Sequence, residues 1–191
     1  WGGAVVRFKD GSDGSVLDGF TITGGSDDYA GGVDASNASL TIRNCVIRDN
    51  FANGMPNHFG GGGVLGGGNG KRLTIANSHV VSNRVNGGAG GVRVYEGTAA
   101  MTNTLVADNR GEAGVHVNGP LALMNTTVAN NDGGVIFNPP SSATLTLVNG
   151  IVYGNGWSVG VPDQPGAWAI QVSHSDVEGG WSGAGNIDAD P

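Results

Sequence analysis

Residues 41–50 read Thr-Ile-Arg-Asn-Cys-Val-Ile-Arg-Asp-Asn, and the same pattern returns four more times along the chain. Each copy has an asparagine, an aliphatic residue three positions later, and a second asparagine six positions after the first. Five copies with the same spacing indicate a structural repeat. The first asparagines are Asn44, Asn77, Asn103, Asn125 and Asn149, and the second ones are Asn50, Asn83, Asn109, Asn131 and Asn155.

Two weaker copies flank these five. Gly19 and Gly25 take the asparagine positions before the first copy, and His174 and Gly180 take them after the last. The first position recurs every 22 to 33 residues, a length that fits one coil of three short strands joined by turns. The sequence therefore predicts a solenoid of about seven coils. The longest step, of 33 residues, contains the glycine-rich stretch 51–70, and we expect its excess length to be a loop extruded from one coil.

Apolar and polar residues alternate around each first asparagine, which predicts strands whose alternate side chains face a shared interior. Counted from that asparagine, positions −4, −2, +1 and +3 are expected to point inward. Positions −2 and +3 are apolar in every full copy, and position +1 is small. The single cysteine, Cys45, occupies position +1 and is accordingly predicted to be a buried, unreactive thiol. Stacked coils bury a continuous core that no single coil could bury alone.

The asparagines are predicted to form internal ladders that hold the coils in register. We expect the first asparagine of each copy to turn inward at a corner and to hydrogen-bond the asparagine of the next coil. We expect the second to mark another corner, in the left-handed backbone conformation that asparagine tolerates. Asn125 begins a glycosylation sequon but should be inaccessible within the ladder. A recurrent Gly-Gly-Val then opens the next strand, as in residues 62–64 and 90–92.

Three segments of the chain resemble a known group of proteins. Residues 17–25 (Leu-Asp-Gly-Phe-Thr-Ile-Thr-Gly-Gly), residues 44–50 and residues 185–191 (Gly-Asn-Ile-Asp-Ala-Asp-Pro) are similar to segments of bacterial and archaeal β-helix repeat proteins of the pectin-lyase-like superfamily. The resemblance implies an all-β, right-handed parallel β-helix over residues 1–191 as one domain. It also implies an exported protein, extracellular or at the cell surface. We expect the chain to be a mature form or a fragment of a longer one.

The composition disfavours several classes of function. Glycine provides 37 of the 191 residues without a Gly-X-Y period, which excludes collagen. A net charge of −7 argues against nucleic acid or an anionic membrane surface as a partner. No apolar run approaches the ~20 residues of a membrane-spanning helix. A single cysteine excludes an internal disulfide framework.

A glycosidase-like or lyase-like active site would need clustered carboxylates. Asp49 and Asp108 share one position of the repeat, but the coil between them has Ser82 there, so no cluster is expected. The sequence leaves enzymatic activity open but favours a protein without catalysis, and it predicts no cofactor. The residues considered for catalysis are Asp49, Asp108 and Asp132, with Arg48 and Arg110 near them.

Two further groups of residues are candidates for ligand binding. Carboxylate oxygens are preferred ligands of Ca²⁺, and the weak candidates for such a site are Asp27, Asp28, Asp188 and Asp190. Exposed aromatic side chains often bind carbohydrate. Trp157, Trp168 and Trp181 either form such a platform or cover the last coil of the solenoid.

No amphipathic capping helix is found at either end of the repeat, so either the caps lie outside these 191 residues or the sheet edges pair with another copy. Identical ends that pair head to tail form an open filament. The sequence therefore favours an extracellular structural module that self-associates through its coil ends, as a filament, matrix or cell-surface subunit. The alternative is a β-helix that binds or degrades polysaccharide, as the resemblance implies.

Overall fold

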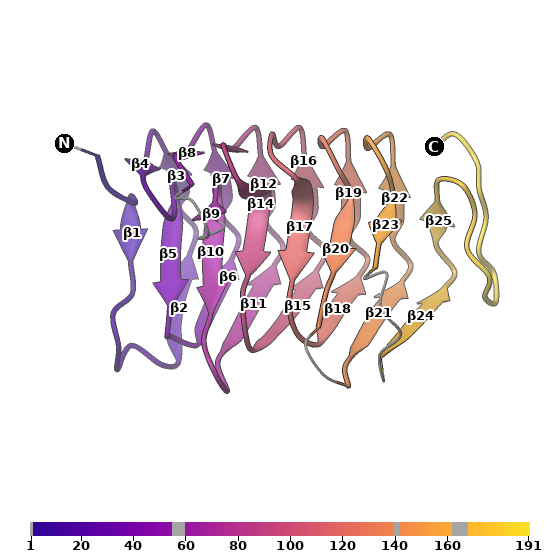
Figure 1. The fold of residues 1–191 in the computed structure, drawn as a ribbon, viewed down its shortest axis with the longest axis horizontal. Coiled ribbons are helices and arrows are strands. Elements are labelled where there is room, and N and C mark those ends of the chain that lie inside the picture. The colour runs from indigo at the N-terminus through magenta and orange to yellow at the C-terminus, as the bar shows by residue number, and fades with distance from the viewer. Residues whose placement is uncertain (1, 55–59, 140–141, 162–167) are drawn as a thin grey trace.

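The computed structural model describes residues 2–54, 60–139, 142–161 and 168–191. Short strands wind around one axis, and each stacks in parallel on the equivalent strand of the next coil (Figure 1). This confirms the predicted all-β parallel solenoid, and the described residues contain no helix. The solenoid has about six turns rather than seven, since seven strands stacked in one sheet are separated by six steps.

Three long sheets form the walls of the solenoid. Sheet 1 contains β1 (Val6–Arg7), β5 (Val33–Ser36), β10 (Val64–Gly67), β14 (Gly88–Val94), β17 (Ala113–Val117), β20 (Val135–Phe137) and β23 (Val159–Gly160), with β9 (Gly60–Gly61) paired to β14. Sheet 2 contains β2 (Ser15–Asp18), β6 (Leu40–Arg43), β11 (Arg72–Ala76), β15 (Thr98–Thr102), β18 (Leu121–Met124), β21 (Thr144–Val148) and β24 (Ala169–Ser173). Sheet 3 contains β3 (Thr21–Thr23), β7 (Val46–Arg48), β12 (His79–Val81), β16 (Leu105–Ala107), β19 (Thr127–Ala129), β22 (Ile151–Tyr153) and β25 (Asp176–Val177).

A short fourth sheet lies at the corner between sheets 3 and 1, and its strands are β4 (Ser26–Asp27), β8 (Phe51–Ala52) and β13 (Arg84–Val85). The excess length of the 33-residue step is predicted to be extruded as a loop within residues 51–70, and the structure places strands in the described part of that stretch. It contains β8, β9 and β10, and β10 pairs with both β5 and β14. Residues 55–59 lie outside the described residues.

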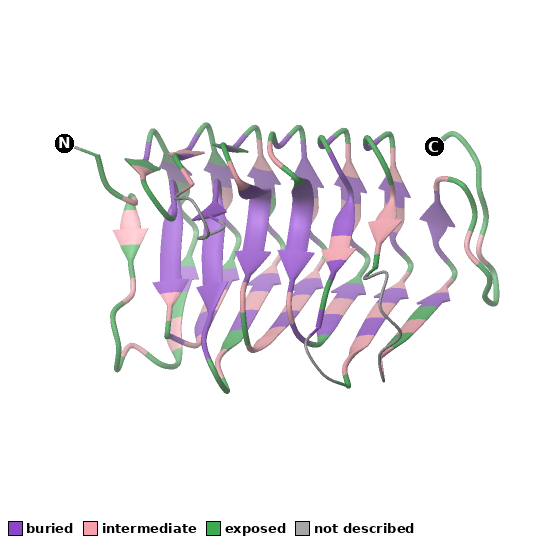
Figure 2. Cartoon of the chain, viewed as in Figure 1, coloured by how far each residue is buried: buried purple, intermediate pink, exposed green. Residues whose placement is uncertain are grey.

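The interior is filled by the columns that the repeat predicts, and Figure 2 marks the buried residues of each strand in purple. Alternation along each strand sends every second side chain inward, and the same register in every coil stacks equivalent side chains on one another. Positions −2 and +3 are buried from one coil to the next. Position −2 holds Ile42, Ile75, Met101, Leu123, Leu147 and Val172, and position +3 holds Ile47, Val80, Val106, Val128, Val152 and Val177.

Position +1 takes small side chains because they fill the tight corner between sheets 2 and 3. Cys45 is 1% exposed, and its Sγ donates to the carbonyl of Arg43 at 3.1 Å. The Ser78 hydroxyl makes the equivalent bond to Ala76 at 2.7 Å and also accepts the N–H of Cys45 at 3.1 Å. The buried, structural role predicted for Cys45 is confirmed.

The second asparagine of each copy forms the internal ladder. From Asn50 to Asn131 each Nδ2 donates to the Oδ1 of the next coil at 2.9 to 3.1 Å, and Asn155 is the last acceptor. Each Nδ2 also donates to a main-chain carbonyl of the preceding coil, as Asn109 does to Val80 at 2.9 Å. The same Oδ1 accepts a main-chain N–H, so the buried amide uses both its donors and both its acceptor sites.

The inward position predicted for the first asparagine is wrong. Asn44, Asn77, Asn103, Asn125 and Asn149 are exposed, with φ between 49° and 54°. This left-handed corner conformation turns the side chain away from the core, and position +1 fills the space inside. The exposed amides still link in places, from Asn125 to Asn103 at 3.0 Å and from Asn103 to Asn77 at 3.1 Å. Asn125 is therefore accessible, contrary to expectation.

The second asparagine is not left-handed either. At that corner the positive φ belongs to the residue before it, such as Asp49, Ser82 or Asp108.

The glycines that follow the second asparagine have a packing role. A Cβ on Gly91 would lie 2.4 Å from the carbonyl oxygen of Gly114, so the stacked backbones leave no room for a side chain.

Candidate functional site

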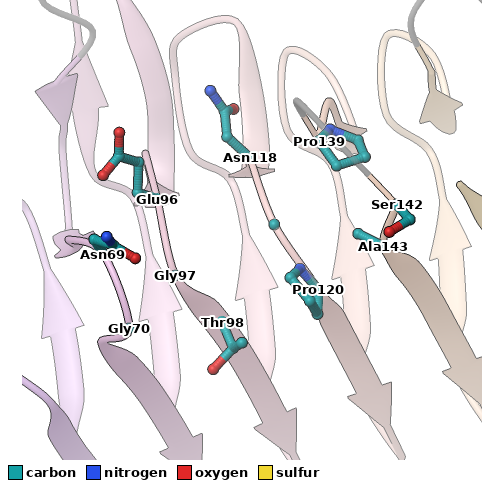
Figure 3. A pocket seen from close by; sticks show the side chains of 11 residues that line it. Asn69, Gly70, Glu96, Gly97, Thr98, Asn118, Pro120, Pro139, Ser142 and Ala143 are labelled. Atoms are coloured by element: carbon teal, nitrogen blue, oxygen red, sulfur yellow. The ribbon is translucent and has the colours of Figure 1, made fainter. Parts of the chain in front are cut away.

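A groove of about 410 Å³ lies at the corner between sheets 1 and 2 (Figure 3). The turns after β10, β14, β17 and β20 supply its walls, so the groove crosses four successive coils. Asn69, Glu96 and Asn118 provide polar groups, and Pro120 and Pro139 provide apolar ones. The arrangement is a shallow channel along the solenoid axis, with hydrogen-bonding groups at intervals of one coil.

The chemistry of the groove suits a neutral ligand. Glu96 is the charged side chain among the described residues that line it, and no described Lys or Arg does. A carboxylate without a neighbouring cation repels an acidic polymer. Hydroxyl groups of a ligand have Thr98 and Ser142 as partners in addition to the two amides.

Behind the groove, Arg93 and His116 point to the outer side of sheet 1 and are nevertheless buried, at 3% and 7% exposed. Figure 2 shows β14 and β17 buried along their whole length, unlike the alternating strands of sheet 2. Arg93 Nη1 donates to Asn118 Oδ1 at 2.9 Å and to the His116 carbonyl at 3.3 Å. Arg93 thereby fixes the amide of Asn118 at the wall of the groove.

Both groups have displaced pKa values. Burial lowers the pKa of Arg93 to about 10, which leaves it charged at neutral pH. Burial first, and then the charge of Arg93, lowers the pKa of His116 to about 3. His116 Nδ1 lies 3.9 Å from Glu112, but a neutral imidazole forms no ion pair. His116 is thus unsuited to donate a proton as a general acid near pH 7.

Sequence reasoning missed Arg93 and His116. The signal available was their position directly after the valine of the Gly-Gly-Val and Ala-Gly-Val motifs. That position faces outward on sheet 1, where a polar residue is ordinary. The repeat pattern therefore gives no sign that these two side chains are buried, and only the structure shows it.

The carboxylates considered for catalysis do not come together. Asp49 forms an ion pair with Arg48, and Asp132 forms one with Arg110 at 2.7 Å, with all four side chains exposed to a large extent. Asp108 is exposed at the corner two coils from Asp49. Each is a solvated turn residue, and these three described carboxylates do not face one another across a common site.

The weak calcium candidates lie at opposite ends of the solenoid. Asp27 accepts the N–H of Tyr29 at 2.9 Å and forms an ion pair with Arg7 at 3.0 Å. Asp27 and Asp28 both line one shallow cavity. Asp188 accepts the N–H of Gly179 at 3.2 Å, and Asp190 is exposed. In the part of the chain that the structure describes, no group of three or more His, Cys, Asp or Glu side chains is arranged to hold a metal ion.

The three tryptophans do not form a common platform. Trp168 and Trp181 are half-buried against the core. The Trp157 ring lies over Gly133, where a Cβ would come within 2.4 Å of it. This arrangement favours the interpretation that these side chains cover the last coil.

At the C-terminal end of the solenoid, the chain folds back over β25 and its corner, while β23 and β24 pair with a strand on one side only. Residues 178–184 lead back from the end of β25 to lie beside His174, which precedes β25. Trp181 packs against the core on the way. Ile187 then pairs in parallel with Asp176, and Asn186 Oδ1 accepts the N–H of Ser175 at 3.1 Å. Gly185, with φ 69°, repeats the left-handed corner of each earlier coil. The segment therefore forms part of an extra coil over sheet 3.

At the N-terminal end, Gly3 pairs with Ser26, and the inward Leu17 and Ile22 of the first coil are buried. β2 and β3 each pair with a strand on one side only. Phe20 aligns with Cys45, since its carbonyl accepts the N–H of Val46 at 2.9 Å just as Cys45 accepts that of His79. Phe20 thus stands in a column of small buried residues, yet it is 56% exposed.

Charge is distributed unevenly along the axis. Residues 1–110 contain nine basic and nine acidic residues, and residues 111–191 contain seven acidic residues and no Lys or Arg. The whole net charge of −7 therefore belongs to the C-terminal part of the chain.

Comparisons with known proteins return no relative: no family model, no curated protein and no solved structure matches the chain. Among the described residues, no helix has the length and apolar character that crossing a membrane requires.

Proposed function

We propose that this protein is a rigid structural module, extracellular or at the cell surface, that associates with other copies through an end of its solenoid. The observation that carries the proposal is the N-terminal end, where strand edges and the aromatic side chain of Phe20 lie open to solvent. Unpaired strand edges bind further strands readily. The scattered carboxylates support a role without catalysis.

Self-association is tested by measuring molar mass by light scattering across a concentration series, together with electron microscopy of the same material. We expect species larger than the 19.1 kDa chain, and a mass that rises with concentration. Monomers at every concentration would count against the proposal.

The second candidate function is polysaccharide binding along the corner groove. It is favoured by a channel that crosses four coils and repeats its polar groups once per coil, as a linear glycan repeats its sugar units. Because Glu96 is the charged group in the groove, neutral glycans fit it better than acidic ones.

Calorimetry with neutral and acidic oligosaccharides tests this candidate. Asn118→Ala should weaken binding of a neutral glycan, while Asn130→Ala, on an exposed turn outside the groove, should leave it unchanged. Chain cleavage of the glycan, abolished by Asp108→Ala, would show instead that the protein is an enzyme.

A further inference from the structure

Glycine follows asparagine directly at six places in the chain, at Asn53, Asn69, Asn86, Asn118, Asn149 and Asn155. Such a pair can lose ammonia without an enzyme, because glycine has no Cβ to hinder attack of its nitrogen on the asparagine side chain. We propose that Asn118, at the wall of the corner groove, is a site of self-modification in which Arg93 activates the amide and the Gly119 nitrogen attacks it. This conversion does not depend on association of the solenoid ends.

The reaction needs only water as a co-reactant. The Gly119 nitrogen gives up its proton and forms a bond to Cγ of Asn118. The bond from Cγ to Nδ2 then breaks, and Nδ2 takes up a proton and leaves as ammonia. The product is a five-membered succinimide ring, which water opens at either carbonyl. The result is aspartate or isoaspartate at position 118, with one water consumed, one ammonia released and no change of oxidation state.

The hydrogen bond of the attacking N–H separates the six pairs. A nitrogen that must lose its proton is protected when that N–H is already bonded. Three glycines donate the N–H to an acceptor in a neighbouring coil, at 2.9 Å (Gly54 to Asp28), 3.1 Å (Gly150 to Ser175) and 3.2 Å (Gly156 to Asn131). No described residue accepts the N–H of the other three, which are Gly70, Gly87 and Gly119. Asn69, Asn86 and Asn118 are therefore the unprotected asparagines.

Asn118 differs from the other two in the partner of its amide oxygen. Arg93 Nη1 donates to Asn118 Oδ1 at 2.9 Å, and to the carbonyls of Val94 and His116 at 3.3 Å each. Because Arg93 is 3% exposed, water screens its charge only weakly. A cation at Oδ1 withdraws electron density from Cγ and stabilises the negative charge that develops on Oδ1 during attack.

The other two unprotected amides have no such cation. Among the described residues, no Lys or Arg donates to the amide oxygen of Asn69 or Asn86. Both asparagines are exposed. They therefore have the same reactive sequence and the same unbonded N–H as Asn118, without the guanidinium group.

Packing requires the glycine that makes Asn118 reactive. A Cβ at Gly119 would lie 2.0 Å from the carbonyl oxygen of Gly97, so no other residue fits this turn without a shift. The Asn118 N–H is held by the Val94 carbonyl at 2.9 Å, and Pro120 has no N–H to anchor the far side of Gly119. The fold thus fixes Asn118 and Gly119 next to each other and leaves the attacking nitrogen unbonded.

The product would change the chemistry of the groove. Glu96 is the charged side chain among its described lining residues. A carboxylate at position 118 adds a second negative charge to the wall, next to Arg93 (Figure 3). The net charge of the chain becomes one unit more negative than −7.

Peptide mass spectrometry after incubation of the folded protein at mildly alkaline pH measures all six pairs in one sample. We expect conversion at Asn118, Asn69 and Asn86, and intact amides at Asn53, Asn149 and Asn155. Hydroxylamine, which cleaves succinimides, should cut the chain after position 118. An intact amide at Asn118 in samples where Asn69 and Asn86 have converted would overturn the proposal.

Arg93→Gln tests the activation by removing the charge next to the amide. We expect conversion at Asn118 to slow about tenfold, while Asn69 and Asn86 in the same molecules keep their rates and serve as internal controls. Arg93→Lys, which keeps the charge, should restore part of the rate. An unchanged rate in Arg93→Gln would overturn the role of Arg93, and circular dichroism checks that the variants fold.

The unaltered chain provides a second measure if the variants do not fold. In urea the six pairs lose their structural differences and should convert at similar rates. The ratio of the rate at Asn118 to that at Asn69 should therefore be higher in the folded protein than in urea. An equal or lower ratio in the folded protein would overturn the activation by Arg93.

Discussion

The internal ladder makes a sharp prediction for Asn109→Leu. The substitution removes the bonds from Asn109 Nδ2 to Asn131 and to Val80, both 2.9 Å, and those from Asn83 to its Oδ1. The buried N–H of Asn83 loses its acceptor, which costs about 1–3 kcal/mol, and the two bonds donated by Nδ2 contribute about 1 kcal/mol each. Leucine has a similar size and adds some apolar burial. We expect a loss of about 3 kcal/mol.

Asn103→Leu is the matched control, because it makes the same chemical change in the same coil. Asn103 is exposed, so its amide bonds to Asn77 and Asn125 compete with water. Leucine in its left-handed conformation, φ 49°, costs about 1 kcal/mol in strain.

Urea unfolding followed by circular dichroism measures both variants, and the comparison uses midpoints at equal m-values. A smaller loss for Asn109→Leu than for Asn103→Leu would refute the assignment of the inner ladder to the second asparagine. Equal losses would show that burial of the amide does not set its contribution.

Two further predictions concern His116 and Gly91. The folded pKa of His116 is about 3 and its ordinary value is 6.5, so the unfolded chain binds the proton first. Stability should therefore be unaffected by this group above pH 6.5 and decrease as the pH falls from about 6.5 towards 3, and His116→Gln should flatten that decrease in urea titrations between pH 7 and pH 4. Gly91→Ala should destabilise the protein by about 2 kcal/mol or more, because its Cβ meets the Gly114 carbonyl at 2.4 Å. Gly87→Ala, with nothing within 4 Å of the added Cβ, should stay within about 0.5 kcal/mol in the same thermal melts; similar shifts for the two would contradict the packing role of the glycine column.

The corner asparagines show where sequence reasoning reached its limit. Both positions carry the same residue type, and asparagine serves equally as a buried ladder amide and as a left-handed corner residue. A usable signal was present in the flanking copy, where Gly19 replaces the first asparagine. Glycine tolerates a positive φ but has no amide to place in a ladder, so it pointed to the left-handed role.

The repeat by itself determined the parallel solenoid, the inward columns and the small buried site of Cys45. These depend on periodicity along the chain, because one register repeated in every coil stacks like on like. The tertiary structure alone decided which asparagine is buried, that Arg93 and His116 are buried on the outer side of sheet 1, and that the C-terminal segment folds back to pair Ile187 with Asp176. Those features arise from contacts between segments with no common period, such as Trp181 on the core and Phe20 at the open end.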